Sequence, residues 1–190
     1  MILKKLRFRN KHLAVNINSD SSEYGSHFIP LTFAVLNTTG PILEMGIGHY
    51  STPLLHVICM TQKRQLLSVD TSKTWIDNFK NLENHLHKFQ YLPVYEDDWK
   101  ANPKPELWDT IGNEIKWGVV FIDHRPGERR KLDIFRFKNA SEMIVVHDTQ
   151  QPSYDYEKAL CSFKFRLDYK RFDTWTTIVS DFTPLNSYEF

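Results

Sequence analysis

The most informative stretch of this sequence reads Pro41-Ile-Leu-Glu-Met-Gly-Ile-Gly-His-Tyr-Ser51. A short apolar run ends in Glu44, and glycines follow at positions 46 and 48 before a helix-like segment begins. Because glycine gives the backbone unusual freedom and lets it approach a ligand closely, this pattern is typical of a strand that passes into a helix through a tight turn. The stretch therefore predicts a β–α unit that binds a nucleotide-like molecule.

A second acidic residue follows at the distance that such a unit requires. The apolar run Gln65-Leu-Leu-Ser-Val-Asp70 ends in Asp70, which lies 22 residues after Gly48 (70 minus 48). In nucleotide-binding βαβ units, an acid at the end of the second strand accepts hydrogen bonds from ribose hydroxyls. We therefore expect Asp70 to bind a ribose.

Strands and helices alternate along most of the chain. Short apolar runs bounded by turn residues indicate strands, and longer stretches with one apolar face indicate helices. Strands are expected at 42–45, 66–69, 91–95, 117–122 and 143–146, and helices at 28–36, 52–60, 73–86 and, as a short element in a loop, within 103–114. This alternation predicts an α/β fold with a mostly parallel sheet. Residues 1–18 are expected to form a strand or a hairpin.

The C-terminal part has a different character. Residues 163–170 alternate apolar and polar side chains, and residues 175–180 are rich in strand-forming residues. The link between these two runs is too short for a parallel crossover, so we expect them to pair antiparallel. A parallel sheet closed by such a hairpin differs from the dinucleotide-binding dehydrogenases, whose second half repeats the βαβ unit.

Composition and charge are those of a single globular domain. The chain has 190 residues, of which 41% are hydrophobic and 25% are charged, and its formal net charge is +1. A net charge this small does not steer a protein onto nucleic acid or an anionic membrane. A small-molecule partner is therefore favoured over nucleic acid, and no membrane partner is expected.

The sequence also bears on the compartment. No apolar run approaches the roughly 18 residues of a membrane span, and no apolar segment follows the basic N-terminus as in a secretory signal. The two cysteines, Cys59 and Cys161, lie far apart and do not suggest a disulfide framework. These observations predict a cytoplasmic protein.

Acidic residues mark the ends of the expected parallel strands. In open α/β sheets, ligands bind at the carboxyl ends of the strands, so side chains that follow the strands share one site. The four acids at these ends are Glu44, Asp70, Asp123 and Asp148.

Together these features resemble the class I S-adenosylmethionine-dependent methyltransferases, over residues 41–181. The pattern Glu44-x-Gly46-x-Gly48-x-x-Ser51 is similar to the first motif of that family, and Asp70 stands where its ribose-binding acid is expected. The segment Asp97-Asp98-Trp99 is similar to the segment that meets adenine. A nicotinamide-dependent dehydrogenase is disfavoured, because Ser51 replaces the third glycine of that motif.

The resemblance implies a Rossmann-like, seven-stranded, mostly parallel sheet with helices on both faces and S-adenosylmethionine as the cofactor. It further implies one methyltransferase domain over 1–190, with 1–37 as an N-terminal lid and 41–182 as the catalytic core. The cofactor-binding residues that it implies are Glu44, Gly46, Gly48, Ser51, Asp70, Asp98, Trp99 and Asp123.

Two strand ends are similar to those of the small metal-assisted O-methyltransferases related to catechol O-methyltransferase. They read Val120-Phe-Ile-Asp-His124 and Val145-Val-His-Asp-Thr149. In that group the second acid is usually followed by Asn and a catalytic Lys follows the first acid, whereas here Thr149 and Arg125-Pro126-Gly127 occupy these places. The stretch 123–130 is also similar to uncharacterised bacterial and viral methyltransferase-like proteins.

Four candidate catalytic residues converge if the strands that they follow are neighbours, namely Asp123, His124, His147 and Asp148. In one interpretation Asp123 and Asp148 bind Mg²⁺ with waters and Thr149. In a second, the site holds no metal and His124 or His147 is the general base, because the pKa of histidine lies near neutrality. In a third, Asp148 caps a turn and the histidines are structural.

Three further residues are candidates for substrate binding. Arg129 and Arg130 could clamp a carboxylate or phosphate of the substrate, or could form salt bridges with a neighbouring acid such as Asp133. His27 precedes the first expected helix and would lie over the cofactor if the N-terminal segment forms a lid.

The leading hypothesis is a methyltransferase that acts on oxygen or nitrogen of a small molecule. The alternatives are a methyltransferase that modifies nucleic acid or another macromolecule, and a non-catalytic member that binds the cofactor and acts as an interaction module. The acceptor pocket is expected to be lined by the N-terminal segment, residues 97–116 and residues 149–160, which carry no recognisable substrate signature. Nothing in the sequence specifies an oligomeric state.

Overall fold

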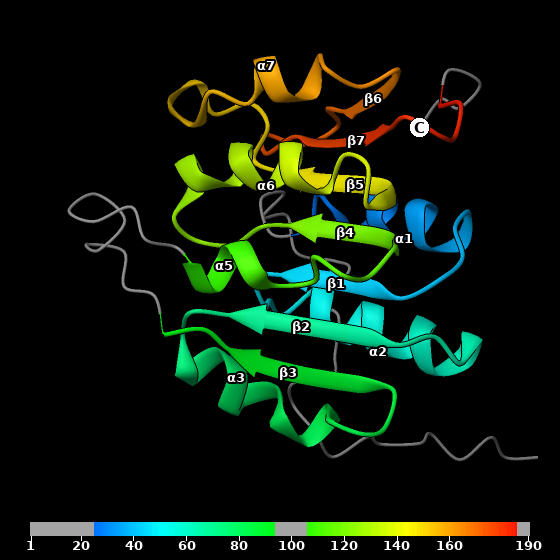
Figure 1. Cartoon of the computed structure of the whole chain (residues 1–190), viewed down its shortest axis with the longest axis vertical. Coiled ribbons are helices and arrows are strands. Elements are labelled where there is room, and N and C mark those ends of the chain that lie inside the picture. Colours follow the sequence, from blue (N-terminus) through cyan, green and yellow to red (C-terminus); the bar gives the residue numbers. More distant parts are fainter. Residues whose placement is uncertain (1–24, 94–105, 186–190) are drawn as a thin grey trace, which may run out of the picture.

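The computed structural model describes residues 25–93 and 106–185. These residues form one seven-stranded sheet in the order β3-β2-β1-β4-β5-β7-β6 (Figure 1). The strands are β1 Ile42–Met45, β2 Leu66–Asp70, β3 His87–Tyr91, β4 Trp117–Ile122, β5 Ser141–His147, β6 Phe165–Tyr169 and β7 Thr176–Ser180. The first five pair in parallel, and β7 runs antiparallel to both β5 and β6. The expected mostly parallel sheet with a C-terminal hairpin is confirmed.

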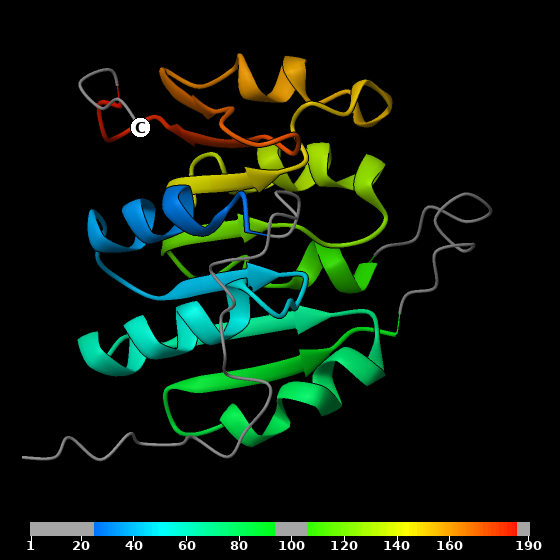
Figure 2. The same cartoon turned by 180° about the vertical axis from the view of Figure 1, so that it is seen from behind.

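Helices cover both faces of this sheet, as expected. The helices α1 Phe28–Leu36 and α2 Ser51–Gln62 lie on one face, and α5 Glu106–Thr110 and α6 Arg130–Phe137 lie on the other (Figures 1 and 2). The helix α3 Lys73–Phe79 packs against β2 and β3, and α7 Glu157–Leu160 packs against α6. None of the described helices is long and apolar enough to span a membrane.

Two apolar cores hold these layers together, and β4 contributes to both. Val119 and Phe121 pack in the core under α1 and α2. Val120 and Ile122 pack in the core under α5, α6 and α7. Because successive side chains of a strand point to opposite faces, a strand buried on both sides is continuously apolar, as β4 is.

Several sequence expectations concern residues outside the described ranges. These are the strand or hairpin over 1–18, most of the lid over 1–37, and Asp98 and Trp99.

The position of β3 corrects the expectation of a strand at 91–95. The strand is His87–Tyr91, and the helix expected over 73–86 ends as α3 at Phe79, followed by a 3-10 turn. The side chain of Asn84 accepts hydrogen bonds from the backbone N–H groups of Leu86 and His87, which ends the helical stretch. Because β3 lies at the sheet edge with polar, exposed side chains, its sequence lacks the apolar run that marks the inner strands.

The helices α6 and α7 were not expected from the sequence. In α6, Ile134 and Phe137 are buried together with the charged residues Arg130 and Asp133. Charged residues on the buried face conceal the apolar period that indicates a helix. The short helix expected within 103–114 is confirmed as α5.

Replacing Phe137 by alanine tests the core under α6. The side chain of Phe137 is fully buried, whereas Phe135 of the same helix is 42% exposed. We expect Phe137→Ala to lower the free energy of unfolding by about 3–5 kcal/mol. The control Phe135→Ala should change it by no more than about 0.5 kcal/mol in urea titrations. Equal losses in the two variants would contradict this packing.

Candidate functional site

The turn after β1 is pressed against the end of β4. Gly46 has a φ angle of +101°, which residues with a Cβ rarely adopt. A Cβ on this residue would lie 2.6 Å from the carbonyl carbon and oxygen of Asp123. Only glycine fits here, so the predicted role of Gly46 in bringing backbone to a ligand agrees with its position.

Asp70 joins this turn to the turn after β2. One carboxylate oxygen accepts a hydrogen bond from the N–H of Ile47 at 2.8 Å, and the other accepts one from the N–H of Ser72 at 2.6 Å. Burial raises the pKa of Asp70, and these backbone hydrogen bonds oppose the rise. A carboxylate has about four lone-pair sites, so Asp70 can accept further hydrogen bonds from a ligand.

Glu44 lies behind the turn and does not line the cavity. It is fully buried, and Thr52 donates to its carboxylate at 2.8 Å while the hydroxyl of Thr52 accepts from the N–H of Gly48 at 3.0 Å. Burial raises the pKa of Glu44 to about 7 although neighbouring hydroxyls oppose this. The expected cofactor contact is thus corrected: Glu44 acts on the turn through Thr52.

A cavity of about 700 Å³ opens at the carboxyl ends of β1, β2, β4 and β5. Small-molecule sites have volumes of about 300–1,000 Å³. Of the residues expected in the site, the cavity is lined by His27, Gly46, Gly48, Ser51, Asp70, Asp123, His124, Arg130, His147 and Asp148.

His147 is held by two carboxylates at the end of β5. Its Nδ1 lies 3.2 Å from Asp123 and 3.3 Å from Asp148, and its Nε2 lies 2.8 Å from the hydroxyl of Ser26. Although burial alone would lower the pKa of His147, the two carboxylates raise it to about 9. A ring that is protonated at neutral pH cannot accept a proton, so the interpretation of His147 as the general base is not supported.

Arg130 links the ends of β4 and β5, and its donors are used within the protein. Its Nε donates to the carbonyl of His124 at 2.6 Å, and its two terminal nitrogens reach the carbonyls of Asp123 and His147. The same nitrogens lie 3.1 Å from the carboxylates of Asp123 and Asp148. A guanidinium has five N–H donors, and these are five acceptors. The expected role of Arg130 as a substrate clamp is therefore replaced by a structural one.

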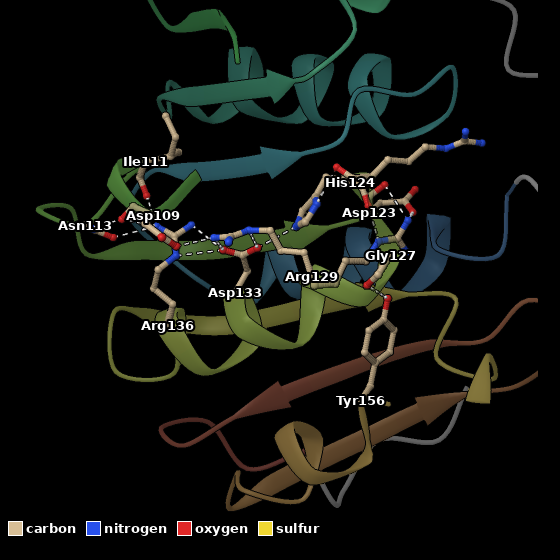
Figure 3. Close-up of polar contacts among 12 residues, drawn as sticks. Asp109, Ile111, Asn113, Asp123, His124, Gly127, Arg129, Asp133, Arg136 and Tyr156 are labelled. Carbon is tan, nitrogen blue, oxygen red and sulfur yellow. Dashed lines mark hydrogen bonds and ion pairs between the residues drawn. The ribbon is translucent and has the colours of Figure 1, made fainter. Parts of the chain in front are cut away.

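Behind Arg130 and the carboxylates that it contacts, Asp133 of α6 contacts three basic side chains (Figure 3). It is fully buried and lies 2.9 Å from Nε2 of His124, 3.3 Å from Nε of Arg129 and 2.8 Å from Arg136. Arg129 also pairs with Asp109 at 2.6 Å and does not line the cavity. Arg129 is therefore not placed to clamp a substrate, which corrects that expectation.

His124 is also held by Asp133 and by its packing against Trp108. Its ring is 2% exposed and packs on Trp108 with the ring centroids 4.4 Å apart. Because Asp133 holds Nε2, the expected role of His124 as a base is replaced by a role in anchoring the end of β4 to α6.

His27 differs from the other two histidines. It is 5% exposed, and neither ring nitrogen has a hydrogen-bond partner among residues 25–93 and 106–185. Its ring meets that of His147 edge-on, with the centroids 4.9 Å apart. Burial, assisted by the positive charge of His147, lowers the pKa of His27 to about 3. At neutral pH the cavity wall therefore contains a neutral imidazole whose nitrogens are buried without a hydrogen-bond partner among the described residues.

No protein-family model matches the sequence, and none of the curated proteins matches it. Solved structures do match. The METTL16 MTase domain is similar with a TM-score of 0.52 and 12% identity, covering 83% of this chain and 66% of that chain. The chain has the fold of the class I S-adenosylmethionine-dependent methyltransferases.

Two further solved structures with this methyltransferase fold are similar at a TM-score of 0.49. One is the precorrin-6y C5,15-methyltransferase of Geobacter metallireducens, with 13% identity over 79% of this chain and 85% of that chain. The other is the 16S rRNA methyltransferase RsmC of T. thermophilus in complex with AdoMet and guanosine, with 10% identity over 82% of this chain and 39% of that chain. At such identities the likeness shows the fold alone.

The metal interpretation does not fit this site. The ligand atoms of His27, Asp123 and His147 lie within 4.8 Å of one another, which is close enough for a shared ion. However, the guanidinium of Arg130 already bridges Asp123 and Asp148, where Mg²⁺ was expected. A cation there would meet two positive side chains, so we derive no step through a metal.

Some lining residues were not expected in the site from the sequence, among them Ser72, Trp75, Tyr154 and Thr174. Ser72 was the most accessible to prediction, because it follows Asp70 and its hydroxyl caps α3 by accepting the N–H of Trp75. Tyr154 and Thr174 lie in irregular segments after β5 and before β7, and no local pattern marks them.

The pairing of His147 predicts how stability depends on pH. A histidine with a raised folded-state pKa stabilises the protein below its unfolded value of 6.5, and this contribution is lost as the pH rises through about 9. We expect the free energy of unfolding to fall in this range by up to about 1.4 kcal/mol per pH unit. In urea titrations, His147→Gln should lack this fall. Parallel pH dependences for the two proteins would show that the carboxylates do not hold His147 protonated.

Proposed function

We propose that this chain is an S-adenosylmethionine-dependent methyltransferase that methylates oxygen or nitrogen of a small molecule. The proposal is carried by the cavity at the strand ends, where the turn at Gly46 and the carboxylate of Asp70 lie side by side. The methyltransferase fold supports it, because ligands of open α/β sheets bind at this edge.

The residues present fit the cofactor. The turn at Gly46 and Gly48, together with Ser51, would hold its amino-acid part, and Asp70 would accept hydrogen bonds from its ribose. Gly46 lets the turn lie directly against the backbone of Asp123, where a Cβ would not fit, and Asp70 retains lone pairs for a ligand. Bound here, the cofactor supplies an electrophilic methyl group on a sulfonium.

His27 is the proton acceptor in this proposal. Its neutral ring lines the cavity with both nitrogens unpartnered among the described residues, and the carboxylate of Asp123 lies close enough to stabilise the charge that it gains. His27 would take the proton that a hydroxyl or amine of the acceptor must lose when it displaces the methyl group from the sulfonium that the cofactor would supply. Holding the two reactants in line accounts for much of the rate of such a displacement.

The charges of the inner wall favour a small, uncharged acceptor. Asp123 and Asp148 are balanced by His147 and Arg130, so these four side chains sum to zero. The cavity of about 700 Å³ is of the size of small-molecule sites.

Retention on immobilised RNA distinguishes a protein with a small-molecule acceptor from one whose acceptor is a nucleic acid. With a formal net charge of +1, the chain should elute at low salt, because few phosphates would be neutralised. Retention that falls steeply with rising salt would favour the macromolecular alternative. A small basic RNA-binding protein serves as the positive control for the column.

Calorimetry with S-adenosylhomocysteine tests the cofactor site. We expect the wild type to bind it and Asp70→Ala to bind roughly ten to a hundred times more weakly, because hydrogen bonds to a charged group are worth about 1.5–3 kcal/mol. Asp77 provides a matched control, because it is an exposed acid paired with Lys73 on α3. Asp77→Ala should bind as the wild type does. If the wild type fails to bind S-adenosylhomocysteine, the proposed function is wrong.

A further inference from the structure

A line of hydrogen bonds leaves the cofactor turn on the side away from the cavity. The N–H of Gly48 donates to Thr52 at 3.0 Å, and Thr52 donates to Glu44 at 2.8 Å. The other oxygen of Glu44 accepts from the hydroxyl of Ser68 at 2.5 Å. A fully buried carboxyl is thus attached to the turn on one side and to β2 on the other.

The line continues from Ser68 to the surface through two histidines. The hydroxyl of Ser68 lies 2.9 Å from Nε2 of His87, and Nδ1 of His87 lies 3.0 Å from Nδ1 of His56. Ser68 and His87 are fully buried, whereas His56 of α2 is partly exposed. Glu44 is therefore connected to solvent by hydrogen-bonded groups that can each exchange a proton.

The hydrogen bonds along this line can be donated in either of two directions, depending on whether Glu44 is ionised or protonated. When Glu44 is ionised, each donor points toward it, so His87 carries its hydrogen on Nε2. When Glu44 is protonated, it must donate to a neighbouring hydroxyl. Ser68 is suited to accept this hydrogen, because its own can turn to Nε2 of His87. His87 then carries its hydrogen on Nδ1, facing His56.

We propose that Ser68 and His87 are positioning residues that couple the charge of Glu44, and thereby the affinity of the cofactor turn for a cationic ligand, to proton release at His56. The proposal rests on the proposed function for the identity of that ligand. S-adenosylmethionine carries a sulfonium charge, and its product S-adenosylhomocysteine does not. A turn backed by an ionised Glu44 favours the charged donor over the neutral product.

The proton transfer balances along the line. Glu44 gives its proton to the oxygen of Ser68, which passes its own hydrogen to Nε2 of His87. His87 loses its Nδ1 hydrogen to Nδ1 of His56, which becomes positively charged and releases a proton to solvent. Each intermediate group gains one hydrogen and loses one, so the net change is an ionised Glu44 and a free proton.

The surroundings of Glu44 suit a change near neutral pH. Burial raises its pKa to about 7, its hydroxyl neighbours oppose the rise, and the charge of Asp70 adds to it. Cys59 of α2 also faces Glu44, and the residue paired with Glu44 on the neighbouring strand β4 is the apolar Phe121. Burial, with the neighbouring His56, lowers the pKa of His87 to about 3 against the opposing charge of Glu83, so His87 stays neutral.

Nitrogen-15 NMR of the histidines tests the line without a ligand. Between about pH 6 and about pH 8, the His87 ring should change from the Nδ1–H to the Nε2–H tautomer as Glu44 ionises. Glu44→Gln should abolish this change, and His85→Leu, an exposed histidine outside the line, should leave it intact. A single His87 tautomer throughout this range in the wild type would overturn the proposal.

Calorimetry tests the coupling to the ligand. The affinity for S-adenosylmethionine relative to S-adenosylhomocysteine should rise with pH, roughly tenfold for each unit by which the cation lowers the pKa of Glu44. His87→Leu should flatten this dependence, and His87→Gln should retain it, because an amide can donate or accept by turning. A pH-independent ratio in a wild type that binds both ligands would refute the coupling and leave the proposed function standing.

Discussion

The arrangement of the site depends on the buried guanidinium of Arg130. This side chain leaves α6 and reaches the carbonyls of Asp123 and His124 after β4 and of His147 at the end of β5. It also reaches the carboxylates of Asp123 and Asp148. The ends of parallel strands carry polar groups that no sheet hydrogen bond satisfies, and burying them without partners would be costly. One planar cation with five donors satisfies this requirement and fixes the spacing of Asp123 and Asp148.

Because the donors of Arg130 are used within the protein, the charges and roles of the neighbouring histidines and carboxylates are also constrained. The two carboxylates keep His147 protonated, and burial, assisted by the positive charge of His147, lowers the pKa of His27 and keeps its ring neutral. Charge is therefore balanced on the inner wall. Among the described residues, His27 is the one histidine of this wall that is neutral and has no hydrogen-bond partner. In a water-poor site, such a division of charge lets similar side chains perform different tasks.

The sequence predicted the parts of this protein that depend on local order. Gly46 and Asp70 could be placed because a strand, a tight turn and a second strand follow one another along the chain. The mostly parallel sheet and its hairpin followed from apolar strands and a short link. Glu44 was placed on the cofactor side of the turn, although it lies behind it, because spacing along a strand end does not tell which of two faces a side chain takes.

The rest depends on contacts between segments that are distant in sequence. Arg129 and Arg130 are adjacent and chemically alike, yet one pairs with Asp109 and Asp133 and the other joins two strand ends. Only the position of α6 separates these roles, and its buried charges conceal the helix itself. The edge strand β3 was misplaced for a related reason, because few of its side chains are buried and its pattern is weak.

The short turn before α1 contributes to the cavity wall through His27. Ser26 and His27 precede the helix, and Ser26 bonds both to His147 and to Thr174 of the β6–β7 link. A fragment trimmed to begin at Phe28 would retain both apolar cores and every strand, so it would pass ordinary tests of folding. Its cavity would nevertheless be open on one side. A shortened protein selected because it folds well in solution would therefore be unsuitable for ligand-binding experiments.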